Sequence, residues 1–404
     1  VKNMKRKLLI MATLTIFTPA YNRANTLART YKSLCDQTSY DFEWLIIDDG
    51  STDNTAEIVK SWLSESRFKI RYIYQQNQGM HGAHNTAYQN IYTELNTCID
   101  SDDFMPDNAV EQIINYWKQY GSSKYAGLIG LDIREDNSLI GSHFEEKETT
   151  LTDFYANGGT GDKKIVYRTE VIKQYPEYPL FEGEKYVGLA YKYMLIDQDY
   201  KLLTLNKPLV IVDYQPDGSS NQMFRQYWRN PKGFAFYRLT EMKLQPKLSR
   251  RYMSCIHYVS SCIIAKDKQF YKKSTRKGLT LLALIPGLLL FLYIKYKIIA
   301  ETSDISYPSA KIQTLPSQEN MEMNENMKHT LYHIALWDQS STHIYHPLLT
   351  LDVLSDKGWH FETEDNIISI EEDKVLFEVT YGQDQSTTIL YSIKDDTFTE
   401  ITPE

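Results

Sequence analysis

Short apolar runs alternate with longer amphipathic stretches through the first third of the chain. The apolar runs predict strands at 13–17, 43–48, 69–75, 97–100 and 126–133. Between them, apolar residues recur at helical spacing, which predicts helices at 25–37, 56–63, 85–95 and 108–120. Strands of this length that alternate with helices predict a parallel sheet covered by helices on both faces.

The pattern is less regular after residue 136. Residues 185–197 have helical spacing, and 201–214 predict a strand pair interrupted at 206–208. Residues 279–294 are apolar for sixteen positions and have basic flanks. A spanning helix needs about 20 apolar residues, so we expect first a segment lying in the membrane interface, second a buried core helix and third a true span.

The last quarter of the chain predicts a linker followed by a small antiparallel β domain. Short β-type runs after residue 328 are separated by turn signals. The basic and apolar N-terminus resembles a signal peptide, but no convincing cleavage site follows, and we interpret it as leading into the first strand. The predicted organisation is an α/β domain at 1–240, a helical membrane-associating region at 241–300, a linker at 301–327 and an accessory β domain at 328–404.

Composition and charge add two constraints. The chain is 42% hydrophobic and 24% charged, which is ordinary for a folded protein and excludes a fibrous or mainly disordered chain. Residues 301–404 carry a net charge of −15, whereas the first 300 residues carry +7. A basic body suits an anionic substrate or an anionic membrane face. No nucleic-acid-binding module is evident, so we expect no nucleic-acid partner.

Polar clusters follow four of the predicted strands. In chain order they are "TPAYN", "DDGSTD", "QNQGMHGAHN" and "DSDD". Ligands of parallel α/β sheets bind beyond the carboxyl ends of the strands, so these clusters predict one shared site. Ordinary loop polarity would explain the serines and glycines, but it explains adjacent carboxylates poorly.

The "DSDD" cluster places Asp100, Asp102 and Asp103 side by side although their charges repel. Mg²⁺ or Mn²⁺ prefers oxygen ligands, keeps positions open for substrate phosphates and would offset this repulsion. The spacing therefore indicates a divalent-metal site for a phosphorylated substrate. The alternative is an acidic turn in which Asp107 or Asn108 caps the next helix.

These four motifs, in this order, resemble the family-2 glycosyltransferases with the GT-A fold. The resemblance covers roughly residues 13–220 and points to bacterial members that build surface polysaccharides. It implies a Rossmann-like, mostly parallel sheet and an inverting, metal-dependent transferase of the hexosyl or N-acetylhexosaminyl class. The implied donor is a nucleotide-sugar, expected to be UDP-linked, and the implied acceptor is a hydroxyl of a glycan or of a lipid-linked sugar.

The resemblance also implies how the donor is bound. Asp49 would accept a hydrogen bond from a ring N–H of the base. Pro19, Ala20 and Tyr21 would lie against the uracil or ribose. The loop and helix start near the nucleotide, where N–H groups favour anions, would be lined by Asn77, Gly79, His84 and Asn85.

Further roles concern the diphosphate and the metal. Asp100 and Asp102 correspond to the family's D-x-D motif, with Asp102 the first choice for metal contact and Asp103 the second. Arg225 or Arg229 would stabilise the charge of the leaving diphosphate.

The general base is the least regular part of the resemblance. Many members place it in an E-D pair that opens a helix, and no such pair stands here. We expect Glu184 to act as the base because it begins the predicted helical run, with Glu182 second and Asp217 third. For each of them, an acidic helix N-terminus that interacts with the helix dipole is an equal alternative.

The resemblance further predicts a non-processive enzyme. Processive members carry Q-x-x-R-W and several membrane spans, whereas this chain has Gln226 and Arg229 without the tryptophan and a single apolar run. We therefore expect a cytoplasmic protein, peripheral on the inner face of the cell membrane, that meets an acceptor on a polyprenyl-diphosphate lipid.

Two other function classes stay open. A nucleotidyltransferase would need a glycine-rich basic loop after the first strand, and "TPAYNRANT" is not one. A non-catalytic nucleotide-sugar or glycan-binding protein is favoured by the missing E-D pair. The C-terminal domain would mediate homo-oligomerisation, bind glycan or position the acceptor, in that order of expectation.

Overall fold

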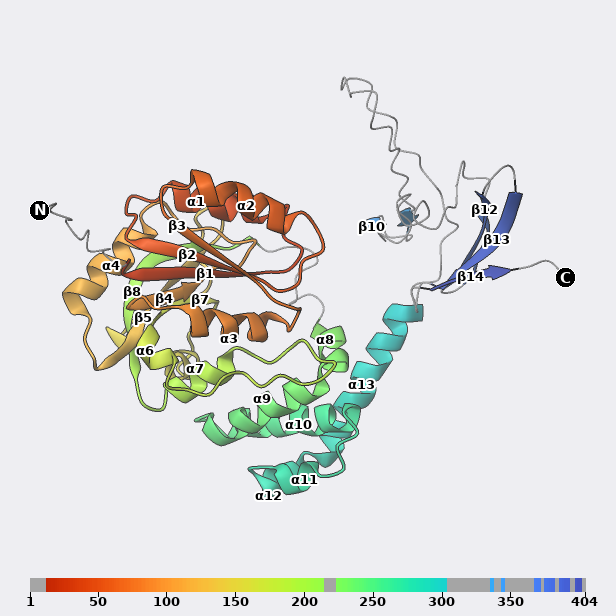
Figure 1. Ribbon diagram of the computed structural model, residues 1–404. Helices are drawn as coiled ribbons and strands as arrows, with labels where there is room; N and C mark the ends of the chain where they lie inside the picture. The colour runs from red at the N-terminus through yellow and green to blue at the C-terminus, as the bar shows by residue number, and fades with distance from the viewer. Residues whose placement is uncertain are drawn as a thin grey trace, which may run out of the picture. The chain divides into compact units, whose positions relative to one another are not determined.

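Eight strands form one mixed sheet with helices packed around it (Figure 1). The computed structural model describes residues 12–213 and 223–303, together with six short strands between 335 and 401. The strand order is β3-β2-β1-β4-β7-β5-β8-β6. The strands are β1 Leu14–Ala20, β2 Phe42–Asp48, β3 Lys69–Tyr74, β4 Leu95–Cys98, β5 Tyr125–Ile133, β6 Glu148–Thr149, β7 Lys163–Arg168 and β8 Lys201–Ile211.

Six of the eight strands run in the same direction, and β7 and β6 run in the opposite one. β1 pairs in parallel with β2 and β4, and β2 pairs in parallel with β3. β7 runs antiparallel to both β4 and β5, whereas β5 and β8 are parallel. The predicted α/β sheet is confirmed, and β7 and β6 make it mixed.

Helices cover both faces of this sheet. One face is covered by α1 Leu27–Cys35, α2 Thr55–Glu65 and α4 Ala109–Tyr120. The other face is covered by α3 Met80–Asn90, α6 Thr169–Ile172 and α7 Ala190–Ile196. The short helix α5 Leu151–Ala156 follows β6.

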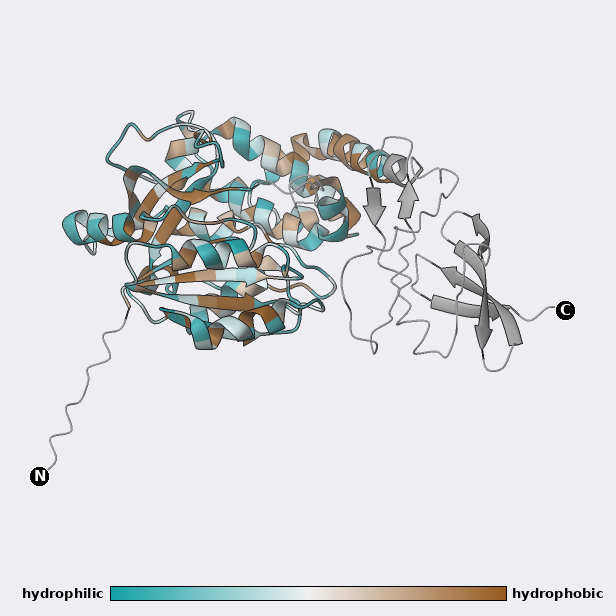
Figure 2. Ribbon diagram, turned by 90° about the horizontal axis from the view of Figure 1, so that it is seen from above, coloured by the Kyte–Doolittle hydropathy of each residue, from teal (hydrophilic) through white to brown (hydrophobic). Residues whose placement is uncertain are grey.

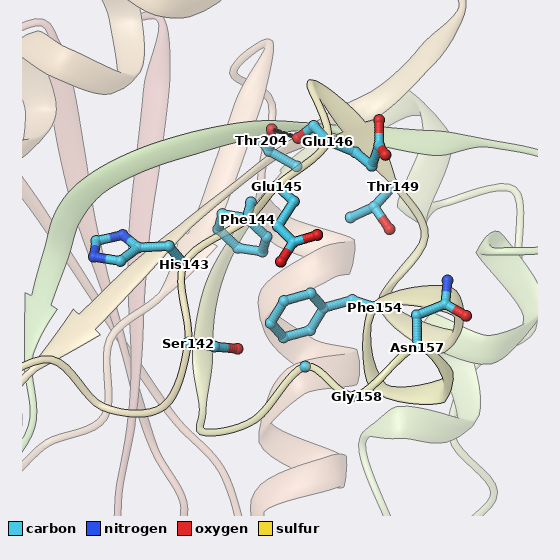
Figure 3. A pocket seen from close by; sticks show the side chains of 11 residues that line it. Ser142, His143, Phe144, Glu145, Glu146, Thr149, Phe154, Asn157, Gly158 and Thr204 are labelled. Atoms are coloured by element: carbon cyan, nitrogen blue, oxygen red, sulfur yellow. Dashed lines mark hydrogen bonds between the residues drawn. The ribbon is translucent and has the colours of Figure 1, made fainter.

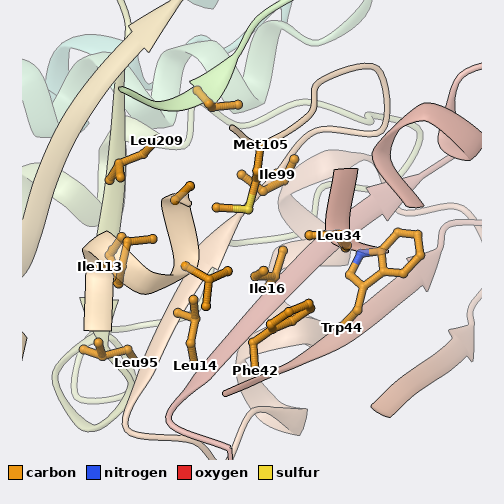
Figure 4. Packing of buried hydrophobic residues seen from close by; sticks show 14 of the residues in the cluster. Leu14, Ile16, Leu34, Phe42, Trp44, Leu95, Ile99, Met105, Ile113 and Leu209 are labelled. Carbon is orange, nitrogen blue, oxygen red and sulfur yellow. The ribbon is translucent and has the colours of Figure 1, made fainter. Parts of the chain in front are cut away.

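The two apolar cores follow from the two-residue repeat of the strands. On β2, Trp44 and Ile46 enter the core under α1 and α2, whereas Leu45 and Ile47 enter the core on the α3 side. Figure 4 shows Trp44 beside Leu34 of α1 in the first core. Each such side chain contributes about 1.5–3 kcal/mol when fully buried, so the strands that carry the candidate site are held firmly.

Three predicted elements differ from the structure. The helix expected at 85–95 is α3, which begins at Met80, because Gly79 with φ +80° ends the preceding loop. The strand pair expected at 201–214 is the single strand β8, whose register with β5 shifts near Pro208. The helix expected at 185–197 is the shorter α7, so Glu184 precedes it by several residues.

A group of helices follows the sheet, as the sequence predicts. They are α8 Met223–Arg229, α9 Pro231–Leu244, α10 Leu248–Ile264, α11 Phe270–Lys273, α12 Lys277–Leu282 and α13 Leu284–Ser303. Met242, Cys255 and Val259 belong to their separate apolar core. No helix in the described part of the chain combines the length and the apolar character that a membrane span requires.

The chain separates into two compact units, Val1–Lys297 and Ile298–Glu404. The described strands of the second unit are antiparallel and form a pair and a four-stranded sheet. They are β9 Ala335–Trp337, β10 His343–Tyr345, β11 Ile367–Glu371, β12 Lys374–Tyr381, β13 Gln385–Ser392 and β14 Thr397–Ile401. The predictions for the N-terminal residues 1–11, for residues 304–327 of the linker and for Asp217 lie outside the described residues, and the predicted domain limits stay predictions. The first three residues of the predicted linker belong to α13.

Candidate active site

The loops after β1 and β2 are tied together by hydrogen bonds. The backbone N–H of Asn22 donates to the Ser51 hydroxyl at 2.9 Å, and the Thr52 N–H donates to Asn22 Oδ1 at 2.8 Å. The N–H of Ala24 donates to Asp53 Oδ2 at 3.0 Å. The "TPAYN" and "DDGSTD" clusters therefore form one unit at the carboxyl edge of the sheet. Within it, Pro19 and Ala20 are buried in β1, whereas the Tyr21 side chain is 48% exposed.

Asp49 joins this unit to the loop before α3. Its Oδ1 accepts hydrogen bonds from Gln75 Nε2 at 2.7 Å and from the Gln78 N–H at 2.8 Å, and its Oδ2 accepts one from the Gly79 N–H at 2.8 Å. Burial raises the pKa of Asp49, and these donors oppose the rise. Asp49 is thus an anchor of the loop in this structure, and its predicted contact with the base stays a prediction.

The first turns of α3 hold two further predicted residues in different ways. Burial lowers the pKa of His84 to about 4. The ring is therefore neutral at pH 7 and donates from Nδ1 to the Met80 carbonyl at 2.9 Å, while Nε2 has no partner among the described residues. The Asn85 amide bonds both backbone groups of Tyr178, at 2.8 and 2.9 Å. Asn85 is therefore a clamp between α3 and the segment before α7, and its donor role is untested.

The aspartate cluster lies beside the end of β1, because the Ile99 N–H donates to the Phe17 carbonyl at 2.9 Å. Burial raises the pKa of Asp103 to about 7, with Lys164 opposing the rise and Asp100 and Asp102 adding to it. Burial and then the charge of Asp100 raise the pKa of Asp102. The carboxylates are thus crowded and incompletely neutralised, as the sequence predicts.

A bound cation would relieve this crowding, but the three aspartates are not equally available to hold one. Asp103 is 6% exposed and accepts the Asp213 N–H at 3.2 Å, so its carboxylate is partly used within the protein. Asp100 and Asp102 are only half-buried. Residues 12–213 and 223–298 contain no group of three His, Cys, Asp or Glu side chains arranged to hold a metal. Mg²⁺ in nucleotide sites is commonly held by one or two carboxylates plus phosphates, and Asp100 with Asp102 would supply them.

Lys164 on β7 is a charged residue of this region that the sequence did not single out. Its Nζ donates to the Cys98 carbonyl at 3.0 Å, next to the cluster. Burial alone would lower the pKa of Lys164, but the charges of Asp132, Asp100 and Asp103 raise it overall. Only the tertiary pairing of β7 with β4 brings it there, and the basic pair that opens "KKIVYR" is the one signal that could have suggested it.

The segment that contains Glu182 and Glu184 lies against the start of α9. Glu184 accepts the backbone N–H groups of Lys232 at 3.0 Å and Gly233 at 2.8 Å. It therefore interacts with the N-terminus of α9, which agrees with the helix-terminus alternative, although that helix is not the one expected. Glu182 is exposed in a turn, and Arg229 is exposed at the end of α8.

Lys185 connects this segment to the donor loops. Its Nζ donates to the Asn77 carbonyl, and its backbone N–H donates to Asn230 Oδ1 at 2.7 Å. The Asn230 amide in turn donates to Gln226 Oε1 at 2.9 Å. Lys185 therefore links the loop before α3 to the segment between α8 and α9. It was not predicted from the sequence, because it belongs to none of the four polar clusters.

A separate cavity lies elsewhere in the first unit. It has a volume of about 240 Å³ and lies between α5 and the segment before β6 (Figure 3). Its lining includes His143, Glu145, Phe154 and Thr204 and none of the predicted site residues. We therefore assign it no part in the candidate active site.

Comparison with known proteins agrees with the resemblance seen in the motifs. Residues 15–175 match the sequence profile of Glycosyl transferase family 2. Over this range the chain belongs to glycosyl transferase family 2. The matched residues include all four polar clusters, so the confirmed family and the candidate active site coincide.

Several bacterial proteins are similar in sequence to part of this chain. The chain is 34% identical over 166 residues to glycosyltransferase GlyA of Streptococcus pneumoniae. This alignment covers 40% of this chain and 23% of that protein. It is 27% identical over 206 residues to the Escherichia coli UDP-Glc:alpha-D-GlcNAc-diphosphoundecaprenol beta-1,3-glucosyltransferase WfgD, covering 51% of this chain and 78% of that protein. The chain spans 19% to 36% of the length of three of its curated relatives, GlyA included.

Solved structures show a looser likeness. The structure of Staphylococcus aureus TarS residues 1–349 in complex with UDP-GlcNAc has a TM-score of 0.46 and 15% identity, covering 78% of this chain and 97% of that one. An overlap this loose does not place individual residues.

Changing Gly79 to alanine tests the contact between the donor loop and Lys185. A Cβ at Gly79 would lie 2.1 Å from the Lys185 carbonyl oxygen, and φ is +80°. We expect Gly79→Ala to lower the free energy of unfolding by about 2–4 kcal/mol, because backbone strain and overpacking add. Urea unfolding of the purified chain measures this loss.

Gly183→Ala is the matched control for this change. Gly183 has φ +77° but nothing within 4 Å of an added Cβ, so only the strain of about 1 kcal/mol is expected. Equal losses in the two variants would contradict the close packing of Gly79 against Lys185.

Proposed function

We propose that this chain is an inverting, metal-dependent glycosyltransferase that uses a UDP-sugar. The observation that supports this most is the convergence of four polar loops at one sheet edge, where the loop after β4 carries half-buried, crowded carboxylates. Membership of family 2 supports the reaction class, and the relative WfgD, whose name gives UDP-Glc as its donor, supports the donor class.

In the proposed reaction, an acceptor hydroxyl oxygen forms a bond to the anomeric carbon of the sugar. The bond from that carbon to the diphosphate oxygen breaks, and its electron pair leaves with UDP. Asp100 and Asp102 would hold Mg²⁺ or Mn²⁺, which neutralises the charge of the diphosphate when bound. Lys185 and Arg229 are further cations near the donor loops and at the end of α8, respectively.

The proton of the acceptor hydroxyl must pass to a base. We propose Glu184 for this role and Glu182 as second choice, as the sequence predicts. Two backbone N–H donors of α9 fix the Glu184 carboxylate in place, and a carboxylate has lone pairs left for a third partner. Fixing the base by a helix N-terminus would keep it oriented during the reaction.

The acceptor class follows by analogy only. The name of WfgD states that it acts on a sugar linked to diphosphoundecaprenol, and a poly(ribitol-phosphate) N-acetylglucosaminyltransferase, TarP of Staphylococcus aureus, is 29% identical over 170 residues. We propose a glycan or polyprenyl-diphosphate-linked acceptor used in the synthesis of a cell-surface polysaccharide.

Release of UDP from UDP-glucose or UDP-GlcNAc tests the proposed reaction class. We expect the purified chain to release UDP slowly with Mn²⁺ and without acceptor, and Asp102→Asn to reduce the rate on the order of a hundredfold. The loss follows because the leaving diphosphate is no longer neutralised. Coupled detection of UDP gives the rates.

Asp107→Asn is the control for this change, since Asp107 is an exposed aspartate of the same loop. It should leave UDP release unchanged. An Asp102→Asn rate equal to the wild-type rate would contradict the role of Asp102. Failure of the wild-type chain to bind any nucleotide-sugar would contradict the function itself.

Glu184→Gln separates a catalytic role from a structural one. Loss of a general base should lower kcat about 10²–10⁴-fold with little change in donor KM. The amide oxygen still accepts one N–H of α9, so the free energy of unfolding should fall by no more than about 1 kcal/mol. The comparison needs a transferred sugar on a matched acceptor, measured beside Glu182→Gln.

If Glu184→Gln loses stability but keeps kcat, Glu184 only caps α9. If Glu182→Gln is also fully active, the missing E-D pair would favour the second candidate function, a non-catalytic nucleotide-sugar-binding protein.

A further inference from the structure

Exposed apolar side chains follow one another along α12 and α13. Their exposed fractions range from 46% to 72%, although leucine, isoleucine and tyrosine side chains of this size are normally covered. We call this surface the apolar ridge; it consists of Leu281, Leu282, Ile285, Leu288, Leu289, Leu292, Tyr293 and Tyr296. The three- and four-residue spacing places most of it on one side of the helices.

The opposite side of the same helices is packed against the rest of the first unit. Thr280 and Ala283 are fully buried. A Cβ at Gly287 would lie 2.6 Å from Val259 of α10, so α13 makes a close approach there. The Phe291 ring stacks on Trp228 of α8 with the centroids 6.4 Å apart. These contacts fix the rotation of α13, so the exposure of the apolar ridge is built into the fold.

Basic residues surround the apolar ridge in the sequence. Residues 268–300 contain seven lysines and arginines and no aspartate or glutamate. Lys272 and Lys277 are exposed before the ridge, and Lys295 is exposed after it. Apolar residues between clusters of cations are typical of helices that lie in a membrane interface.

We propose that the apolar ridge and its basic flanks dock this chain on an anionic lipid bilayer, with α12 and α13 lying in the interface. In Figure 2, α13 is the helix that continues into the grey trace, and brown hydrophobic residues recur along it. Burial of leucine side chains in the acyl boundary supplies affinity. Each lysine near the anionic headgroups adds about fivefold to it at moderate salt.

Charge favours lipid over a second copy of the chain as the occupant. In a two-fold symmetric dimer, the same patch of each copy faces the other. The basic flanks that contain Lys272, Lys277 and Lys295 in one copy would then face the equally basic flanks of the other copy, and like charges repel. An anionic bilayer has the complementary sign over the whole surface.

The proposal is independent of the donor site, because binding to vesicles needs no nucleotide-sugar. Docking on a bilayer would bring the proposed transferase close to a lipid-linked acceptor. Failure of the vesicle experiment would leave UDP release intact, and failure of UDP release would leave vesicle binding intact, so the two proposals fail separately.

Co-flotation of the full chain with liposomes tests this surface. Vesicles of phosphatidylcholine alone are compared with vesicles that contain 30% phosphatidylglycerol, in roughly 0.1 M salt, where charges act over about 10 Å. We expect binding to the anionic vesicles that weakens as salt rises. The double variant Ile285→Asp/Leu289→Asp should bind at least about tenfold more weakly, and Lys272→Glu/Lys277→Glu should lose mainly the preference for anionic lipid.

The matched control is Leu63→Asp/Tyr120→Asp, which places two acids at sites that are 47% and 50% exposed on other helices. It should bind as the wild type does, and thermal unfolding verifies that each variant is folded. Absence of wild-type binding to anionic vesicles overturns the proposal, as does equal binding by Ile285→Asp/Leu289→Asp. A wild-type dimer in light scattering that this variant converts to monomer also overturns it in favour of a second copy.

Discussion

The carboxylates at the end of β4 repel one another, and the surrounding fold nevertheless holds them together. Burial raises the pKa values of Asp102 and Asp103, and Lys164 offsets only part of the negative charge. The parallel pairing of β1 with β4 fixes their position beside the loop that follows β1. Crowded carboxylates do not stabilise the fold, so we interpret this arrangement as a binding site for a positively charged partner.

The same edge of the sheet is coupled to the segment that carries the candidate base. Asp49 holds the loop that contains Gly79, Gly79 packs against Lys185, and Asn230 holds the backbone of Lys185. A donor bound at the loops would therefore lie on a surface continuous with Glu184 and α9. The candidate site would then have a donor side at the loops and an acceptor side at Glu184 and α9, as a reaction between a donor and an acceptor requires.

The sequence predicted the parts of this arrangement that depend on local patterns. Apolar alternation placed β1, β2 and β3 to within a few residues, and the position of polar clusters after strands predicted which loops converge. Residues whose role depends on tertiary pairing were not predictable in this way. Lys164 reaches the aspartates only because β7 runs antiparallel between β4 and β5, and Glu184 meets α9 across 48 residues of chain. Helical spacing alone also misplaced the start of α3, because Gly79 with positive φ sets that boundary.

The first unit thus combines a confirmed family 2 region with a helical region whose apolar side faces outward. We propose that the crowded carboxylates of this region hold a divalent ion together with a nucleoside diphosphate. An electron paramagnetic resonance titration of Mn²⁺ into the full chain with UDP would detect this ion, with UDP alone as the background. We expect Mn²⁺ to bind the wild-type chain in the presence of UDP and to bind Asp100→Asn at least about tenfold more weakly. Equal Mn²⁺ binding by the two proteins, or no binding above the UDP background, would contradict it.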